Sequence, residues 1–141
     1  CIQSAASYER PNPTCETCGL DDLSFRIETQ DADGYTTDYF EQGRPVVFYG
    51  VYQNDCPNNQ KLYVTGPSCL TTTAALISPT GQQYPLPSQC TGTGVIGYEF
   101  EVDGEYVEEL GSWTLNQIGT YGIKAESWHG VLDWHQVFVS M

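Results

Sequence analysis

Two tryptophans and a histidine near the end of the chain are the residues best suited to binding a ligand. Trp128 and Trp134 flank a short segment that begins with His129. If this segment forms a hairpin that pairs Trp128 with Trp134, the two indoles offer apolar surfaces on which a sugar ring can stack. An ordinary cross-strand packing pair is the alternative interpretation. The pattern indicates either a carbohydrate-binding site or the closing hairpin of the fold.

The same hairpin also suggests a metal site. In the register that pairs the tryptophans, His129 lies opposite Asp133, and His135 follows Asp133 by two residues on the same face. Two imidazoles and one carboxylate form a ligand set for a transition metal. A hydrogen-bonded His–Asp pair at a hairpin tip is the commoner arrangement. The sequence leaves both interpretations open.

An acidic segment at residues 30–43 suggests a calcium site. Its carboxylates are Asp31, Asp33, Asp38 and Glu41. Hard oxygen ligands grouped in one loop are what Ca²⁺ prefers. Aligned with an EF-hand loop, however, the segment has Phe40 where the bidentate glutamate belongs. Calcium is the cofactor that this segment suggests, and a solvated acidic turn is the alternative.

Six cysteines are the remaining candidates for chemistry: Cys1, Cys15, Cys18, Cys56, Cys69 and Cys90. Cys15 and Cys18 have the C-x-x-C spacing of redox and zinc sites, but no second such pair and no βαβ pattern accompanies them. The cysteines are therefore predicted to form structural disulfides in an oxidising compartment, and their pairing stays open. Because the chain starts at Cys1 with no leader before it, we expect a secreted or cell-surface protein whose signal peptide is removed.

Composition and missing motifs exclude several functions. The net charge is −13, from 18 acids against 5 bases, so nucleic acid is not expected as a partner. No apolar stretch is long enough to span a bilayer. Neither a G-x-S-x-G motif nor a glycine-rich phosphate loop followed by a helix is present. We therefore expect a protein that is not an enzyme.

Short strands must position these residues. Alternating or β-branched segments are predicted as strands at 23–29, 46–52, 61–65, 73–77, 82–86, 95–102, 105–110, 113–115, 124–128 and 133–139. Gly50 predicts a bulge or a close backbone approach, and Asp103-Gly104 predicts a hairpin. With no amphipathic helical period, the sequence indicates an all-β antiparallel sandwich of about seven to nine strands. Residues 23–141 form this body, and residues 1–22 form an N-terminal arm tethered by disulfides.

Three patterns near the end of the chain carry a resemblance to a known family: Trp113-x-Leu115, Gly119-x-Tyr121-x-Ile123 and Trp134-x-Gln136-x-Phe138. Their order resembles the E, F and G strands of immunoglobulin-like domains. The resemblance implies that Tyr121 is a tyrosine corner, with its hydroxyl bonded to backbone near Gln117. Ile123 stands where the second bridging cysteine of antibody domains would be. What the family implies is a non-enzymatic role in binding, adhesion or assembly.

The leading hypothesis is an extracellular structural or adhesive protein that assembles into a surface filament. Its arm, through Cys1, Ile2, Ala5 and Tyr8, would add as a strand to the sheet of a neighbouring copy and so build a homo-oligomer or polymer. One alternative is a secreted carbohydrate-binding module with a glycan partner at Trp128, His129 and Trp134. A second alternative is a calcium-stabilised adhesion domain.

Overall fold

The computed structural model describes residues 18–57, 59–86 and 94–141, and these form ten strands and one short 3₁₀ helix. The elements are η3 (Leu20–Asp22), β1 (Leu23–Gln30), β2 (Tyr39–Glu41), β3 (Pro45–Asn54), β4 (Leu62–Pro67), β5 (Thr71–Ile77), β6 (Gln83–Pro85), β7 (Val95–Phe100), β8 (Glu105–Thr114), β9 (Gly119–Ser127) and β10 (Leu132–Ser140). None of the described helical segments is long and apolar enough to cross a membrane.

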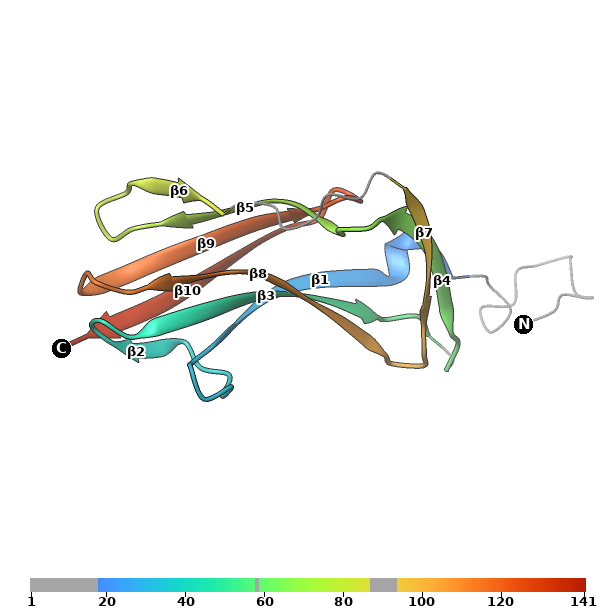
Figure 1. The fold of residues 1–141 in the computed structure, drawn as a ribbon. Helices are drawn as coiled ribbons and strands as arrows, with labels where there is room; N and C mark the ends of the chain where they lie inside the picture. The colour runs from blue at the N-terminus through green and yellow to red at the C-terminus, as the bar shows by residue number, and fades with distance from the viewer. Residues whose placement is uncertain (1–17, 58, 87–93) are drawn as a thin grey trace, which may run out of the picture.

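The strands form three sheets. A three-stranded sheet has the order β1-β3-β8, a five-stranded sheet has the order β2-β10-β9-β5-β6, and β4 pairs with β7. Figure 1 shows the two larger sheets layered over each other, with the β4–β7 ribbon running across one end. All pairings are antiparallel except that between β2 and β10. The predicted all-β sandwich is confirmed, with one parallel edge pair that the sequence did not indicate.

The core forms because alternate side chains of each strand point between the two larger sheets. β1 buries every second residue along its length, including Phe25 and Ile27. From the opposite sheet, β9 buries Tyr121 and Ile123 by the same alternation, and Val137 of β10 joins them. The predicted alternation in these strands is confirmed.

Gly50 lies where the core closes most tightly. A Cβ at this position would come within 2.9 Å of Phe25 Cε1 and 3.1 Å of Thr71 Oγ1. The pairing of β3 with β8 shifts register between Phe48 and Tyr49, immediately before it. Both the close approach and a nearby bulge are therefore present, as the sequence predicted.

Polar side chains join the two sheets where no backbone pairing does. The carboxylate of Glu108, on β8, accepts hydrogen bonds from the backbone N–H groups of Leu70 and Thr71, both at 2.9 Å. The Tyr52 hydroxyl lies 2.8 Å from Thr71 Oγ1. Burial raises the pKa of Tyr52 far above its ordinary value, although the hydrogen bond to Thr71 opposes this shift. Tyr52 therefore stays neutral inside the sandwich.

Tyr121 forms the predicted corner. Its ring is buried in the core, and its hydroxyl oxygen accepts a hydrogen bond from the backbone N–H of Gln117 at 3.0 Å. The bond closes the loop between β8 and β9 over the end of the core. The hydrogen bond expected from the sequence pattern is thus present.

Two expectations about local structure are wrong. Asp103-Gly104 makes a turn, with Asp103 at φ 57°, but not a hairpin, because β7 pairs with β4 while β8 pairs with β3. The strands on either side of the turn therefore belong to different sheets. The segment 30–43, read as a loop, contains β2, whose Phe40 is buried.

A disulfide ties the first described residues to the sandwich. Cys18 is bonded to Cys56, in the segment between β3 and β4, so the predicted disulfide tether is confirmed. Cys69 is also disulfide-bonded. The predicted assembly residues Cys1, Ile2, Ala5 and Tyr8, together with the disulfide candidates Cys15 and Cys90, lie outside the described residues.

Candidate functional site

The outer face of the five-stranded sheet carries an exposed row of large side chains. Alternate residues of β10 point to solvent on this face, and three of them are apolar: Leu132, Trp134 and Phe138. Their exposed fractions are 66%, 61% and 39%. Since residues two apart on a strand lie about 7 Å apart, the row runs along most of β10. An aligned row of exposed apolar side chains is a candidate binding surface.

Trp134 is held in place by a glycine on the neighbouring strand. A Cβ built on Gly122 of β9 would lie 2.9 Å from Cζ3 and 3.5 Å from Cε3 of the indole. The six-membered ring therefore packs against the backbone at Gly122, where no side chain lifts it from the sheet. This contact explains how the ring stays on the surface while remaining largely exposed.

Beside Trp134 is a pocket of about 450 Å³. Its lining comes from β5, β6, β9 and β10 and is mostly apolar: Thr73, Ala74, Ala75, Pro85, Lys124, Ala125, Leu132 and Trp134. Three of the lining residues are alanines, and one of them, Ala75, is paired with Lys124 across β5 and β9. Trp134 is paired with Lys124 on the other side. The pocket is thus an apolar hollow with one lysine in its lining, a composition typical of small-ligand sites.

The apolar row continues onto the parallel edge strand. Tyr39 of β2 is 74% exposed and stacks on Phe138, with ring centroids 5.4 Å apart and planes at 23°. The register places Tyr39 directly beside Phe138. The outer face therefore presents aromatic rings at two places along β10, with Trp134 near one end and the Tyr39–Phe138 pair near the other.

The predicted pairing of Trp128 with Trp134 is wrong. β9 and β10 pair with Glu126 beside Leu132 and Lys124 beside Trp134, so Trp128 lies in the turn and not in the ladder. Trp128 instead packs inward, against Tyr52 with centroids 6.0 Å apart. The candidate ligand-binding tryptophans are therefore separated, and only Trp134 faces outward.

His129 belongs to the turn as well. Its Nε2 donates to the Leu23 carbonyl oxygen at 3.1 Å, and its Nδ1 lies 2.8 Å from Ser127 Oγ. These bonds tie the turn to the first residue of β1. His129 is thus engaged in structure and does not lie opposite Asp133, as the predicted register required.

The proposed two-histidine metal cluster is not assembled. Asp133 accepts a hydrogen bond from the backbone N–H of Ile27 at 2.8 Å, while His135 Nε2 lies 2.5 Å from Asp38 Oδ1. Both contacts join β10 to the first part of the chain. Within the described ranges, no group of three or more His, Cys, Asp or Glu side chains is placed to hold a metal ion.

The four acids suggested as calcium ligands are used separately. Asp31 Oδ1 accepts backbone hydrogen bonds from Asp33 and Tyr35, which closes its own turn. Asp38 faces Thr29 and His135. Glu41 forms an ion pair with Arg44 at 3.9 Å. The structure does not bring these carboxylates to one point.

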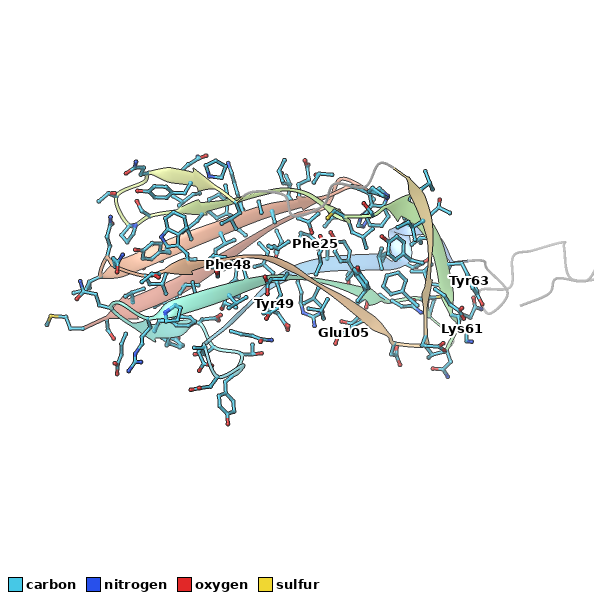
Figure 2. The ribbon with its side chains drawn as sticks, in the orientation of Figure 1. Phe25, Phe48, Tyr49, Lys61, Tyr63 and Glu105 are labelled. Atoms are coloured by element: carbon cyan, nitrogen blue, oxygen red, sulfur yellow. A yellow bond between two sulfur atoms is a disulfide. The ribbon has the colours of Figure 1, made fainter. Side chains whose placement is uncertain are left out.

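A second hollow lies on the β4–β7 ribbon. It has a volume of about 550 Å³ and is lined by Tyr63, Val64, Thr65, Gly97, Tyr98 and Glu99. Glu99 Oε1 accepts from both Lys61 Nζ and the Tyr63 hydroxyl, each at 3.2 Å. Figure 2 shows Lys61 and Tyr63 at the β4 end of the molecule. Lys61 is not among its lining residues and is already paired with Glu99 and Glu101, so this hollow offers less to an anionic ligand than the pocket beside Trp134.

The sequence alone does not identify every residue of the candidate site. It gives no indication of Tyr39, Gly122 or Lys124. The alternation of β10 contains a signal for Leu132 that the sequence analysis does not use. Placing Gly122 and Lys124 beside Trp134 requires the register of β9 against β10. The aromatic partner Tyr39 requires knowing that β2 joins β10.

The sequence matches no family model and no curated protein. Among solved structures, the fold is similar to the CARDB domain of a Pyrococcus furiosus protein in complex with di-metal ions, at 16% identity and a TM-score of 0.44, over 84% of this chain and 88% of that chain. The sporulation control protein Spo0M from Bacillus subtilis is similar at 10% identity and a TM-score of 0.36. That match covers 83% of this chain but only 49% of Spo0M. Likenesses at this level assign neither a family nor a function.

Proposed function

We propose that this chain is a non-enzymatic extracellular domain that binds carbohydrate on the outer face of its five-stranded sheet. The observation that carries the proposal is the position of Trp134, which is 61% exposed, packs on Gly122 and borders an apolar pocket. An indole fixed on a flat surface suits stacking against the apolar face of a sugar ring. Thr73 and Lys124 at the same pocket supply polar groups for its hydroxyls.

We further propose that the sandwich is of the immunoglobulin-like type. The order β1-β3-β8 suits strands A, B and E, and β10-β9-β5-β6 suits G, F, C and C′. The hydrogen bond from Gln117 to the Tyr121 hydroxyl supports this assignment, because it has the form of a tyrosine corner. Under this assignment β4 and β7 are an additional ribbon at one end.

An oxidising, extracellular location is the setting that we propose for this domain. Its support is the disulfide between Cys18 and Cys56, since such bonds persist chiefly outside the cytosol. The small share of charged residues, 16% of the chain, leaves a surface dominated by hydroxyl, amide and aromatic groups. Such a surface fits recognition of a neutral or weakly charged glycan.

A glycan array, followed by calorimetry on the best ligand, tests carbohydrate binding. Trp134→Ala removes the stacking surface and is expected to weaken binding at least about tenfold, or about 1.4 kcal/mol. Tyr63→Ala is the matched control, because Tyr63 is 66% exposed but lies on the separate β4–β7 ribbon. Equal affinity of Trp134→Ala and the unaltered protein, or no glycan bound by either, would refute the proposal.

Filament assembly is a second candidate function. One observation favours it: the disulfide from Cys18 to Cys56 ties the start of the described chain near the β4–β7 end, whereas β10 ends at the far side of the sandwich (Figure 1). The described chain thus starts and stops at opposite ends of the sandwich, a geometry that would suit head-to-tail association. Electron microscopy and size-exclusion chromatography of the full chain and of a variant lacking residues 1–13 test this candidate. Unchanged assembly in that variant would eliminate strand donation by the arm.

A further inference from the structure

Lys124 stands apart from the other cations of this acidic protein. The chain has 5 Lys and Arg residues against 18 acids. Three of the cations in the described residues are ion-paired: Arg26 with Glu28 and Glu105, Arg44 with Glu41, and Lys61 with Glu99 and Glu101. Lys124 is the fourth, and it forms no ion pair with any carboxylate in the described part of the chain. Its charge is therefore available to a ligand.

Lys124 is one of the residues that line the pocket beside Trp134. Its cross-strand neighbours are Trp134 on β10 and Ala75 on β5, and neither offers a hydrogen-bond acceptor to its ammonium group. Glu126 follows two residues later on the same face of β9 but does not pair with it. Lys124 and Trp134 both line the same pocket. An apolar ring and an unpaired cation thus lie side by side at one hollow.

We propose that the bound glycan carries one anionic group, a carboxylate or a sulfate on a sugar ring, which contacts Lys124 Nζ while a neighbouring ring stacks on Trp134. This inference rests on the carbohydrate-binding function proposed above. An ammonium in a partly apolar site gains more from an anionic oxygen than from a neutral hydroxyl, because charge-assisted hydrogen bonds are roughly twice as strong. The ligand class is therefore an acidic sugar.

The net charge restricts the ligand further. At −13 the protein repels extended polyanions, and one unpaired lysine cannot neutralise a row of charges. At physiological ionic strength, charges beyond about 8 Å are largely screened, so a single anionic group at Lys124 is affected mainly by the charges nearest to it. A neutral glycan with an isolated acidic residue fits both constraints, and a heavily sulfated chain such as heparin does not.

Binding to matched glycans tests the proposal. The probes are lactose, 3′-sialyllactose, 3′-sulfolactose, a glucuronate-terminated trisaccharide with its glucose-terminated counterpart, and heparin. The unaltered protein is expected to bind at least one acidic member about tenfold more tightly than its neutral counterpart. The sialyl and glucuronyl arms report a carboxylate and the sulfo arm reports a sulfate. This preference should weaken as salt is raised.

Substitutions of Lys124 test whether this residue causes the preference for acidic over neutral glycans. Lys124→Met keeps the apolar stem and removes the charge, so it is expected to bind acidic and neutral members equally, whereas Lys124→Arg should retain the preference. Lys61→Met is the matched control, because Lys61 lies just before β4 and does not line the pocket. Thermal melts of each variant exclude unfolding as the cause.

The results of these experiments distinguish failure of the proposed role of Lys124 from failure of carbohydrate binding itself. Binding of neutral members as tightly as acidic ones, or an acidic preference that survives in Lys124→Met, overturns the role of Lys124 but leaves carbohydrate binding intact. Tighter binding of heparin than of the single-charge probes also overturns the inference. Failure of every probe to bind overturns the proposed function, and the inference falls with it.

Discussion

The six-membered ring of Trp134 packs against Gly122, so closely that a Cβ at residue 122 would lie 2.9 Å from Cζ3. Gly122 is not among the residues with positive φ, so an alanine there is opposed only by the ring. Because the ring is mostly exposed, it can tilt away from the added methyl group. The contact therefore offers a way to move the indole without removing it.

Gly122→Ala is expected to lower glycan affinity about tenfold while changing the free energy of unfolding by no more than about 0.5 kcal/mol. Calorimetry gives the affinity, and near-ultraviolet circular dichroism reports the changed setting of the indole. Gly97→Ala is the control, since a Cβ at residue 97 meets nothing within 4 Å. Full affinity in Gly122→Ala would show that the orientation of Trp134 does not matter.

Tyr121→Phe removes the hydroxyl that accepts from Gln117 at 3.0 Å. The loop between β8 and β9 then loses its bond to the core, and we expect the free energy of unfolding to fall by about 1 kcal/mol. Urea denaturation measures the change. Tyr35→Phe, at a position 71% exposed, should leave stability unaltered, and an equal loss in both variants would argue against the corner.

Glu108→Gln replaces one of the two carboxylate oxygens that accept from Leu70 and Thr71. The amide group would present a donor to a backbone N–H, so the link from β8 to the start of β5 weakens, with a loss of about 1–3 kcal/mol. Denaturant unfolding compares this variant with Glu109→Gln, whose side chain is exposed on the same strand. Similar stability of the two variants would contradict the bridging role of Glu108.

The pH dependence of stability should reveal the buried Tyr52. Burial raises its pKa in the folded protein above the ordinary 10.0, so above that pH the unfolded chain binds fewer protons than the folded protein. The free energy of unfolding therefore falls as pH rises from 10.0, by up to about 1.4 kcal/mol per unit from this group.

Tyr52→Phe lacks this group, so its stability should decline less steeply than that of the unaltered protein in the same alkaline range. Urea titrations at intervals of half a unit measure both slopes. Tyr35→Phe is the control and should follow the unaltered protein. Parallel declines in Tyr52→Phe and the unaltered protein would indicate that residue 52 makes no special contribution.

Strands with one buried face could be predicted well from the sequence. In β1 and β9, buried residues alternate along the strand with residues that are less buried. The apolar residues of the sequence recur with the same two-residue period, so the sequence indicates these strands directly. β2 could not be found in this way, because three residues are too short to display a period. β2 pairs with β10, which lies near the other end of the sequence, and no local pattern predicts so distant a pairing.

The neighbours of Trp134 could not be predicted from the sequence, because they depend on the register of the β9–β10 hairpin. Aromatic matching favoured Trp128 beside Trp134, but the turn closes earlier, where the backbone N–H of Ser127 donates to the Val131 carbonyl at 2.9 Å. Gly130 adopts φ 88° within that turn, a conformation that glycine accepts readily. Turn geometry thus outweighed side-chain matching, and it placed Lys124 rather than Trp128 beside Trp134.

The parallel pair of β2 and β10 affects how the chain folds as it is synthesised. Tyr39 and Phe138, which lie side by side in the sheet, are separated by roughly a hundred residues. On the ribosome, β2 therefore emerges long before β10, and Phe40, which is buried in the folded protein, lacks its neighbours on β10 during that interval. The stacked pair of Tyr39 and Phe138 is consequently completed only at the end of synthesis, after all the strands between β2 and β10 have been made.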